Sequence, residues 1–288
     1  MVLLTYIIGE DGNVRDISPI YVLGPPAFAD RTIETVKSWT YEPATLNGKP
    51  VPQVTLFRFT YDATSLVAGA NLDIADALKS LATSPTGQKL DEDISKLREG
   101  FRDPMIGRYQ RAILALPLAQ HAIKQGDFLE ARRLAMLGTA VKSGASQGMV
   151  RSLWLIRIAA DLFLGEIGDA LFSRAQIGDV KDIAPALTIL ENLDQTRAKL
   201  DAMPQFAVQA KIPEGPESTV YWHILYRRTF GFRVMSGNLE KFVLGCRGGM
   251  VESKITETAQ WQVPKSWSDC AMHVYGTPGT RLNLIEAN

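Results

Sequence analysis

Three stretches of this 288-residue chain differ in the spacing of their apolar residues. In residues 1–61 apolar positions mostly alternate, with one short helical pattern between them. From about residue 66 to residue 203 apolar residues recur at three- and four-residue steps, and from residue 217 onward alternation returns. Alternation indicates strands and the 3.6-residue period indicates helices. We therefore expect an α+β protein with domains at residues 1–62, 66–204 and 217–288.

The first stretch predicts the order strand, strand, helix, strand. Residues alternate over Val2–Ile8, and the pair Asp11-Gly12 supplies the positive φ of a hairpin turn before a return strand at Val14–Tyr21. A helix is expected at residues 28–39 and a last strand at Val51–Tyr61. Prolines at the start of that last strand withhold amide donors, which favours an edge position in the sheet.

The middle stretch predicts a domain of helical hairpins. The segment Gln125–Ala131 resembles the loop between paired helices in tetratricopeptide repeats, and a weaker copy, Leu164–Ala170, follows 39 residues later. Tandem repeats are therefore an alternative to plain hairpins. Pro117 is expected to end or kink its helix, because it lacks an amide and clashes with the preceding turn.

The last stretch predicts a small antiparallel β domain. Pro204, Pro213 and Pro216 with Gly215 indicate a linker before it. Five or six short strands in about 70 residues suggest a sandwich or barrel. The strands are expected at residues 220–226, 230–234, 239–244, 254–261, 271–275 and 281–285.

Composition excludes several kinds of partner. The chain has 31 basic and 31 acidic residues, so no net field attracts nucleic acid or anionic lipid. No apolar run reaches the roughly 18–20 residues that span a bilayer. Met1 stands where a strand is already under way, so we expect that an upstream export or anchoring segment has been removed. Membrane association is expected only through such a segment or through a partner.

Two cysteines, Cys246 and Cys270, stand close together near the end of the chain. Their number alone fits two buried thiols as well as a disulfide. A bridge across 24 residues would stabilise the fold by about 3 kcal/mol in the chain-entropy model. The strand-like, turn-rich surroundings favour the disulfide.

Four short segments of the first domain together resemble the C-terminal domain of TonB-type energy transducers. In that family they are the hairpin turn, the end of the helix, a second turn and the closing strand. The order and the spacing both agree with the family pattern. The segments are Asp11-Gly12-Asn13-Val14, Trp39-Thr40-Tyr41-Glu42-Pro43-Ala44, Asn47-Gly48-Lys49-Pro50-Val51 and Val54-Thr55-Leu56-Phe57-Arg58-Phe59.

The resemblance implies a non-enzymatic binding protein of the bacterial cell envelope, located in the periplasm. In the family, a segment of an outer-membrane transporter adds as a strand beside the closing strand, where main-chain groups are available. Here that position falls on Val54, Thr55, Leu56, Phe57, Arg58 and Phe59. An envelope location also favours a disulfide between Cys246 and Cys270.

Departures from the family limit what the resemblance implies. The family's membrane anchor and proline-rich spacer are not seen, and more than two hundred residues follow the domain. Classical energy transduction is therefore not expected. Two alternatives stay open: the edge is solvated or covered by the helical domain, or the TonB-like domain is a structural module of a periplasmic scaffold or cell-wall-associated protein.

No pattern of residues indicates catalysis, a metal or a cofactor. The three histidines His121, His223 and His273 have no metal-ligand spacing with neighbours. Cys270 and His273 are three apart, which puts them on opposite faces of a strand. No phosphate-binding loop is present. Three tryptophans could line a groove, but core positions are the more frequent role of such residues: Trp222, Trp261 and Trp267.

Overall fold

The computed structural model describes residues 1–22, 26–59, 72–83, 86–103, 108–139, 146–178, 180, 186–214, 220–256 and 259–288. The chain divides into two compact units: residues 1–60 together with 197–288 form one, and residues 61–196 form the other. Helices and antiparallel strands are both abundant, which confirms the α+β class. The first and last parts of the sequence therefore share one unit, and the helical unit is inserted between them.

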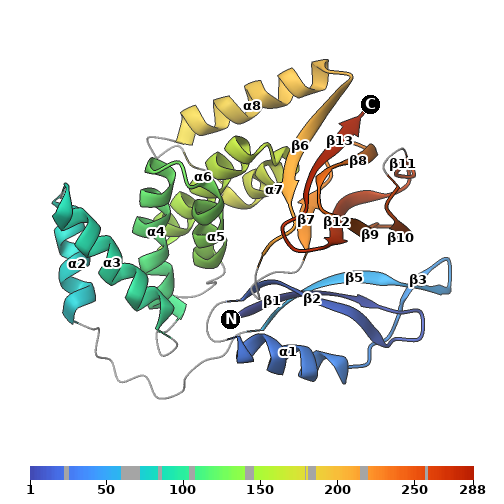
Figure 1. The fold of residues 1–288 in the computed structure, drawn as a ribbon, viewed down its shortest axis with the longest axis horizontal. Coiled ribbons are helices and arrows are strands. Elements are labelled where there is room, and N and C mark those ends of the chain that lie inside the picture. The colour runs from blue at the N-terminus through green and yellow to red at the C-terminus, as the bar shows by residue number, and fades with distance from the viewer. Residues whose placement is uncertain are drawn as a thin grey trace. The chain divides into compact units, whose positions relative to one another are not determined.

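A three-stranded antiparallel sheet and one helix form the beginning of the chain (Figure 1). The strand order is β2-β1-β5, and the helix α1 packs on one face. A short hairpin, β3 with β4, leads into β5. The bounds are β1 Val2–Ile8, β2 Val14–Val22, α1 Ala27–Lys37, β3 Ala44–Leu46, β4 Lys49–Val51 and β5 Gln53–Phe59. The predicted strand end at Thr60-Tyr61 lies outside the described residues.

Two glycines make the turns of this sheet possible. Gly12 has φ +78°, and a Cβ on it would meet the carbonyl oxygen of Tyr41 at 2.1 Å. That carbonyl belongs to a residue whose amide donates to the Gly12 carbonyl at 2.9 Å, so only glycine fits. Asn47 and Gly48, with φ +52° and +77°, form the turn of the β3–β4 hairpin.

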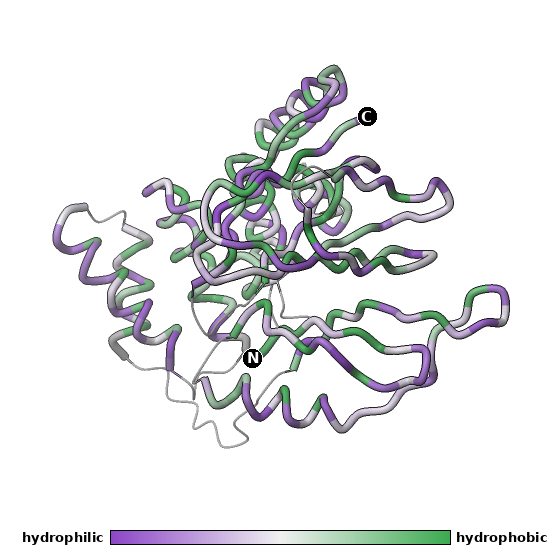
Figure 2. The backbone as a smooth tube through the Cα atoms, turned by 45° about the vertical axis from the view of Figure 1, so that its right-hand side comes forward, coloured by the Kyte–Doolittle hydropathy of each residue, from purple (hydrophilic) through white to green (hydrophobic). Residues whose placement is uncertain are grey.

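The end of the chain forms two four-stranded antiparallel sheets, in the orders β10-β9-β12-β7 and β11-β8-β13-β6. Their facing side chains make a core that includes Phe230, Phe242, Met272 and Leu284. Hydrophilic residues gather at the hairpin tips in Figure 2. The bounds are β6 Gln205–Lys211, β7 Tyr221–Ile224, β8 Thr229–Ser236, β9 Leu239–Arg247, β10 Gly249–Lys254, β11 Gln260–Gln262, β12 Ser268–Gly276 and β13 Arg281–Ala287.

Two sequence predictions for this region are wrong. The linker expected after Pro204 contains β6, which pairs with β13 along its whole length. Its alternation of Phe206, Val208 and Ala210 with polar neighbours was obscured by the flanking prolines. The single strand expected at residues 254–261 does not form: β10, which pairs with β9, ends at Lys254, and β11, which pairs with β8 in the other sheet, begins at Gln260. The chain crosses between the sheets there.

Strand β1 is covered on both faces. On the α1 side Val2, Leu4 and Tyr6 are at most 1% exposed, and on the opposite side Thr5 and Ile7 are 1% and 2% exposed. A strand buried on both sides has a nearly continuous apolar sequence rather than a strict alternation. The sequence Val-Leu-Leu-Thr-Tyr-Ile-Ile of β1 fits that position.

The sheet β10-β9-β12-β7 covers the β1 face that lies opposite α1. Lys241 of β9 contacts Asp16 of β2, and Tyr275 of β12 forms a hydrogen bond with Ser18 of β2. Farther along β9, a Cβ on Gly245 would come within 2.6 Å of the Val54 Cβ in β5. Strand β9 therefore runs across the small sheet from β2 to β5.

Four charged side chains connect β2 to β9 and β10 at the rim. Arg15 contacts Asp16 and Glu252 at 2.6 and 3.0 Å, and Lys241 contacts the same two carboxylates at 3.1 and 2.8 Å. Asp16 has φ +50° in a β-bulge of the β1–β2 pair, which re-aims its side chain. The hydrogen bond from Lys241 lowers the pKa of Glu252. The two cations and two anions balance each other.

The inserted unit consists of helices, and from α2 to α7 each helix packs on the next. Helix α4 continues through Pro117, so the proline does not end the helix, and a kink there stays a prediction. Helix α4 contacts α3, α5 and α6. The last helix, α8, crosses the boundary between the units. The bounds are α2 Leu72–Ala82, α3 Gln88–Arg102, α4 Arg108–Lys124, α5 Phe128–Thr139, α6 Gln147–Leu164, α7 Ile167–Ile177 and α8 Ala186–Ala202.

The two similar loops of the sequence are helix-to-helix turns of the same form. Gly126 and Gly165 have φ +74° and +78°. In each turn the next amide reaches back to the preceding helix: Asp127 donates to Ala122 and Glu166 donates to Asp161, at 2.9 and 2.8 Å. Helices α4 and α6 thus end in the same kind of glycine C-cap, and a tandem repeat stays a prediction.

Buried charges link helices α5, α6 and α7. Arg132 contacts Asp161 at 2.9 Å and Asp169 at 3.0 Å, and Arg157 lies 3.4 Å from Asp169. Burial raises the pKa of Asp161, against the pull of the two guanidinium groups. The ion pairs hold the helix ends together within the unit.

Candidate functional site at the outer edge of strand β5

Strand β5 is an outer strand of its sheet. All seven of its residues pair with β1 on one side, and in the described part of the chain no strand pairs with the other side. An outer strand directs alternate main-chain N–H and C=O groups away from its neighbour. All six residues predicted to bind a guest segment lie on this strand: Val54, Thr55, Leu56, Phe57, Arg58 and Phe59.

The α1 side of this edge is aromatic. Phe57 and Phe59 pair with Leu4 and Val2 and share their face. The Trp39 ring meets Phe57 edge-on, with centroids 5.1 Å apart, and lies 6.4 Å from Phe59. All three rings are half-buried. The sequence prediction did not include Trp39, although it stands in the motif at the end of the helix.

A hydrogen-bonded pair of tyrosines lies next to Trp39 on the aromatic side of the edge. The hydroxyl groups of Tyr6 and Tyr41 lie 2.6 Å apart, and Tyr41 meets Trp39 edge-on at 6.3 Å. Burial, together with the hydrogen bond to Tyr41, raises the pKa of Tyr6, so the Tyr6 hydroxyl keeps its proton. The hydrogen bond fixes Trp39 beside β5 through Tyr41.

The other side of the edge carries Val54, Leu56 and Arg58. Val54 packs under Gly245, whereas Leu56 is 47% exposed and Arg58 is also exposed. An exposed leucine between a packed valine and an arginine makes this side mixed in character. It differs clearly from the aromatic side.

The ends of β9 and β12 follow the contact between Gly245 and Val54. Strand β9 lies over β5 at Gly245, and its last two residues, Cys246 and Arg247, come directly after it. Antiparallel β12 begins beside them with Asp269 and Cys270. We call these four residues the shelf.

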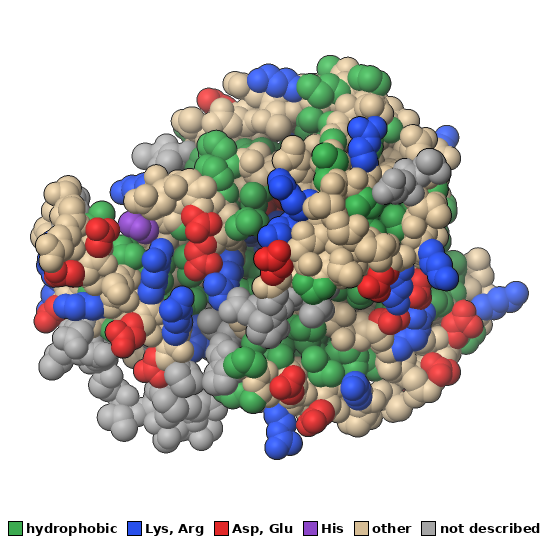
Figure 3. Space-filling model, viewed as in Figure 1, with side chains coloured by type: hydrophobic (Ala, Val, Ile, Leu, Met, Phe, Trp, Pro, Cys, Tyr) green, Lys and Arg blue, Asp and Glu red, His purple; other side chains and the backbone are tan. Residues whose placement is uncertain are grey.

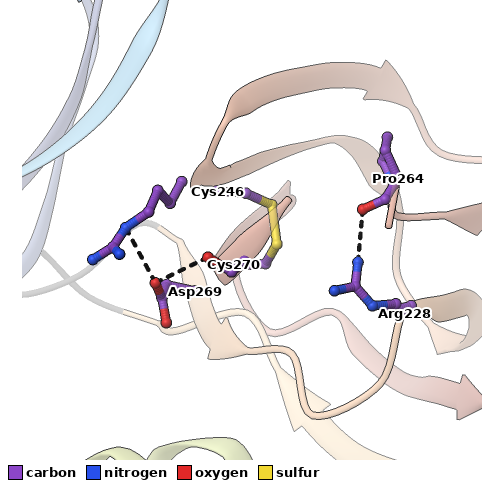
Figure 4. The surroundings of a disulfide bond; sticks show 7 residues. Arg228, Cys246, Pro264, Asp269 and Cys270 are labelled. Atoms are coloured by element: carbon purple, nitrogen blue, oxygen red, sulfur yellow. Dashed lines mark hydrogen bonds and ion pairs between the residues drawn. A yellow bond between two sulfur atoms is a disulfide. The ribbon is translucent and has the colours of Figure 1, made fainter. Parts of the chain in front are cut away.

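A disulfide and an ion pair join the two strands of the shelf (Figure 4). The bond links Cys246 to Cys270, whose Cα atoms are 4.1 Å apart, as the sequence led us to expect. Arg247 Nε lies 3.4 Å from an Asp269 carboxylate oxygen, with the two side chains 83% and 70% exposed. A β-bulge, with φ +51° at Asp269, opens the pairing at this point. Nothing in the sequence distinguished this ion pair from ordinary surface charges.

Four residues that the sequence analysis considered as candidate site residues are instead part of the packed interior or of the disulfide. His223 is fully buried, with its Nε2 2.9 Å from the Glu286 carboxylate of the opposite sheet. Cys270 is in the disulfide and His273 lies on the opposite face of β12, so they form no nucleophile and base. Trp261 packs against Phe230 and Phe242 in the core of the sandwich.

The visible surface shows no concentration of one charge. In Figure 3 acidic and basic side chains are interspersed over the face that is drawn. Among the described residues, no helix is both long enough and apolar enough to cross a bilayer. The outer edge of β5 is therefore the candidate binding site on this surface.

Comparison with protein families supports the interpretation of residues 1–61 as a TonB-like domain. The model of the Gram-negative bacterial TonB protein C-terminal matches residues 1–63, which confirms the resemblance seen in the sequence. The match covers the three-stranded sheet, α1 and the β5 edge. That domain is a non-enzymatic energy-transducer domain of bacterial envelope proteins. Comparison with curated proteins and with solved structures found no match.

Proposed function

We propose that this protein is a periplasmic binding protein that takes up a short extended segment of another protein as an added strand on β5. The observation that carries the proposal is the position of β5 as an outer strand in a TonB-type domain. Main-chain pairing supplies affinity in such a complex, and alternate side-chain positions supply specificity. The predicted residues Val54–Phe59 are the docking strand.

The partner class follows from the family domain. A segment of an outer-membrane transporter is the guest that this domain type implies, and the periplasm is the compartment where the two meet. The Cys246–Cys270 disulfide suits that oxidising compartment. The helical hairpins of the inserted unit add a second protein-binding surface in this proposal, because stacked helix pairs commonly present one.

A second candidate function is that of a periplasmic scaffold. The observation that favours it is the covered face of the small sheet: Gly245 packs on Val54, and the Arg15, Asp16, Lys241 and Glu252 ion pairs close the rim. In a scaffold the TonB-like sheet is a permanent layer of the larger unit, and partners bind elsewhere. Binding at the β5 edge distinguishes the two candidates.

Peptides with blocked amides test strand addition directly. Overlapping peptides from outer-membrane transporters are first screened for binding by fluorescence anisotropy. The tightest peptide is then made in two versions, N-methylated at odd or at even positions. A strand added to β5 points only one of these amide sets at the protein, so one version should lose binding and the other should keep it. Equal effects of both versions would refute strand addition.

A variant of the protein gives the complementary test. Leu56→Pro removes one amide from the docking strand and should abolish peptide binding. Leu46→Pro, at a similarly exposed leucine in the β3–β4 hairpin, is the matched control and should leave binding in place. Circular dichroism checks that each variant folds. Undiminished affinity of a folded Leu56→Pro protein would favour the scaffold.

A further inference from the structure

His273 of β12 lies between the small sheet β2-β1-β5 and the sandwich. It pairs with Val243 of β9 and with Trp222 of β7, and directly paired residues of an antiparallel sheet share one face. That face meets the small sheet, because Gly245, two residues after Val243, packs on Val54 of β5. The His273 side chain is therefore enclosed between two packed sheets, and its residue is only 1% exposed.

The central strand of the small sheet, β1, lies beneath this histidine. Toward one end of β12, Tyr275 forms a hydrogen bond with Ser18 of β2. Toward the other end, Ala271 pairs with Gly245, which lies over β5. Because β1 runs between β2 and β5, His273, midway between Tyr275 and Ala271, lies over β1.

Three buried polar atoms at this interface have no hydrogen-bond partner in the described part of the chain. They are Thr5 Oγ1 of the small sheet, with Trp222 Nε1 and His273 Nε2 on the facing sheet of the sandwich. Thr5 pairs with Ser18 and faces away from α1, so it points into the same layer. Buried polar groups normally have partners, and leaving one unpaired is destabilising. The interface is thus less completely satisfied than the apolar cores on either side of it.

A charge on His273 would have no partner in the closed interface. Strand β1 presents Thr5 and Ile7 to it, and neither side chain ionises. The ionisable side chains that the described residues place on the two facing surfaces lie over the outer strands β2 and β5 instead. Burial alone lowers the pKa of His273, to about 4. Those ionisable side chains are Arg15, Asp16, Arg58, Lys241, Glu252 and Tyr275.

We propose that acid releases the TonB-like sheet from the sandwich along this interface, with His273 as the sensor, while both parts stay folded. The small sheet has its own core with α1, which includes Val2, Leu4 and Val36. The sandwich has a separate core and the disulfide. Separation gives water access to the imidazolium without breaking either core, and an imidazolium is stable only where it is solvated or paired.

Release has a consequence for β5. It takes Gly245 off Val54 and separates Lys241 from Asp16, so the start of β5 and the second face of the small sheet become accessible. The proposal goes beyond strand addition and does not depend on it. It makes the cover on the TonB-like sheet a removable one.

A thiol probe measures release in the full chain. Val243→Cys places the probe beside His273, and Val274→Cys, in the sandwich core, is the matched control; both valines are fully buried. Labelling with a dithiodipyridine is followed from about pH 7.5 to about pH 4.5 and is divided by the rate for the urea-unfolded variant at the same pH. One proton, bound with a pKa of about 4 when closed and 6.5 when open, should speed the interface probe on the order of fiftyfold over this range. The core probe should not change.

Faster labelling of the interface probe alone would support release. Equal acceleration of both probes would mean global unfolding and would overturn the proposal, as would a constant rate at the interface probe. If circular dichroism shows that Val243→Cys does not fold, Ile7→Cys, at a 2% exposed position of β1, takes its place.

A histidine variant identifies the sensor. His273→Leu, added to Val243→Cys, should abolish most of the response to acid. His121→Gln in the same background is the control and should keep the response, because His121 lies in the helical unit. An unchanged response in the His273→Leu protein would overturn the role of His273.

Discussion

Gly245 of β9 lies directly over Val54 of β5, two residues that are 191 positions apart in the sequence. A Cβ on Gly245 would stand 2.6 Å from the Val54 Cβ and 2.7 Å from one of its methyl groups. Through this contact the C-terminal sandwich packs on the TonB-like sheet at the start of β5, the proposed docking strand. It also fixes where the shelf begins.

Replacing Gly245 should weaken the packing of β9 on β5. We expect Gly245→Ala to lower the free energy of unfolding by about 1–3 kcal/mol through overpacking, measured by urea denaturation. Adding Val54→Ala should recover part of that loss, giving a favourable coupling in the double-mutant cycle. Gly148→Ala, at a helical position with nothing within 4 Å, serves as control and should cost no stability. A coupling of zero would contradict the contact.

Acid should destabilise the protein through His273. Burial lowers the pKa of His273 from 6.5 to about 4, and in the described part of the chain its Nε2 has no hydrogen-bond partner. The unfolded chain binds this proton below about pH 6.5 and the folded chain only below about pH 4, so stability falls as the pH drops through that window. The contribution lost is on the order of 3 kcal/mol.

A histidine variant isolates this effect from the titration of carboxylates. His273→Leu should remove the extra loss of stability between about pH 6.5 and pH 4, measured by urea midpoints at several pH values. His121→Gln is the control, because the His121 side chain is less buried and its removal should leave most of the pH dependence. Identical pH profiles for wild type and His273→Leu would refute the assignment.

Removing the disulfide should destabilise the sandwich. Cys246→Ser with Cys270→Ser frees a 24-residue loop in the unfolded chain, which should cost about 3 kcal/mol. The readout is the shift in urea midpoint with and without reductant. Reductant should lower the midpoint of the wild type to that of the double variant and leave the variant unchanged. A wild type indifferent to reductant, with thiols shown to be free, would contradict the prediction.

The turn between α6 and α7 should depend on its glycine. Gly165 ends α6 with φ +78° in open space, so Gly165→Ala pays only the left-handed backbone cost of about 1 kcal/mol. Gly165→Asn should lose less, because asparagine tolerates this conformation better. Thermal unfolding compares both variants with wild type. Equal losses for Ala and Asn would show that something other than φ determines this position.

Part of the fold and of the site was predictable from local patterns. Asp11-Gly12 and Asn47-Gly48 identified the turns because few residues adopt positive φ. Alternation and the helical period identified most strands and helices, and the closing-strand motif identified β5, which carries the proposed docking residues Val54–Phe59. The strand β6 was missed because its neighbouring prolines outweighed a short alternation.

The sequence by itself determined the local elements, because turn geometry and side-chain periodicity act over a few residues. The tertiary structure alone decided that the last domain covers β1, that Gly245 meets Val54, and that Lys241 of β9 contacts Asp16 of β2. Those relations join surfaces nearly two hundred residues apart. They depend on shape and charge complementarity between whole sheets, which no local pattern encodes.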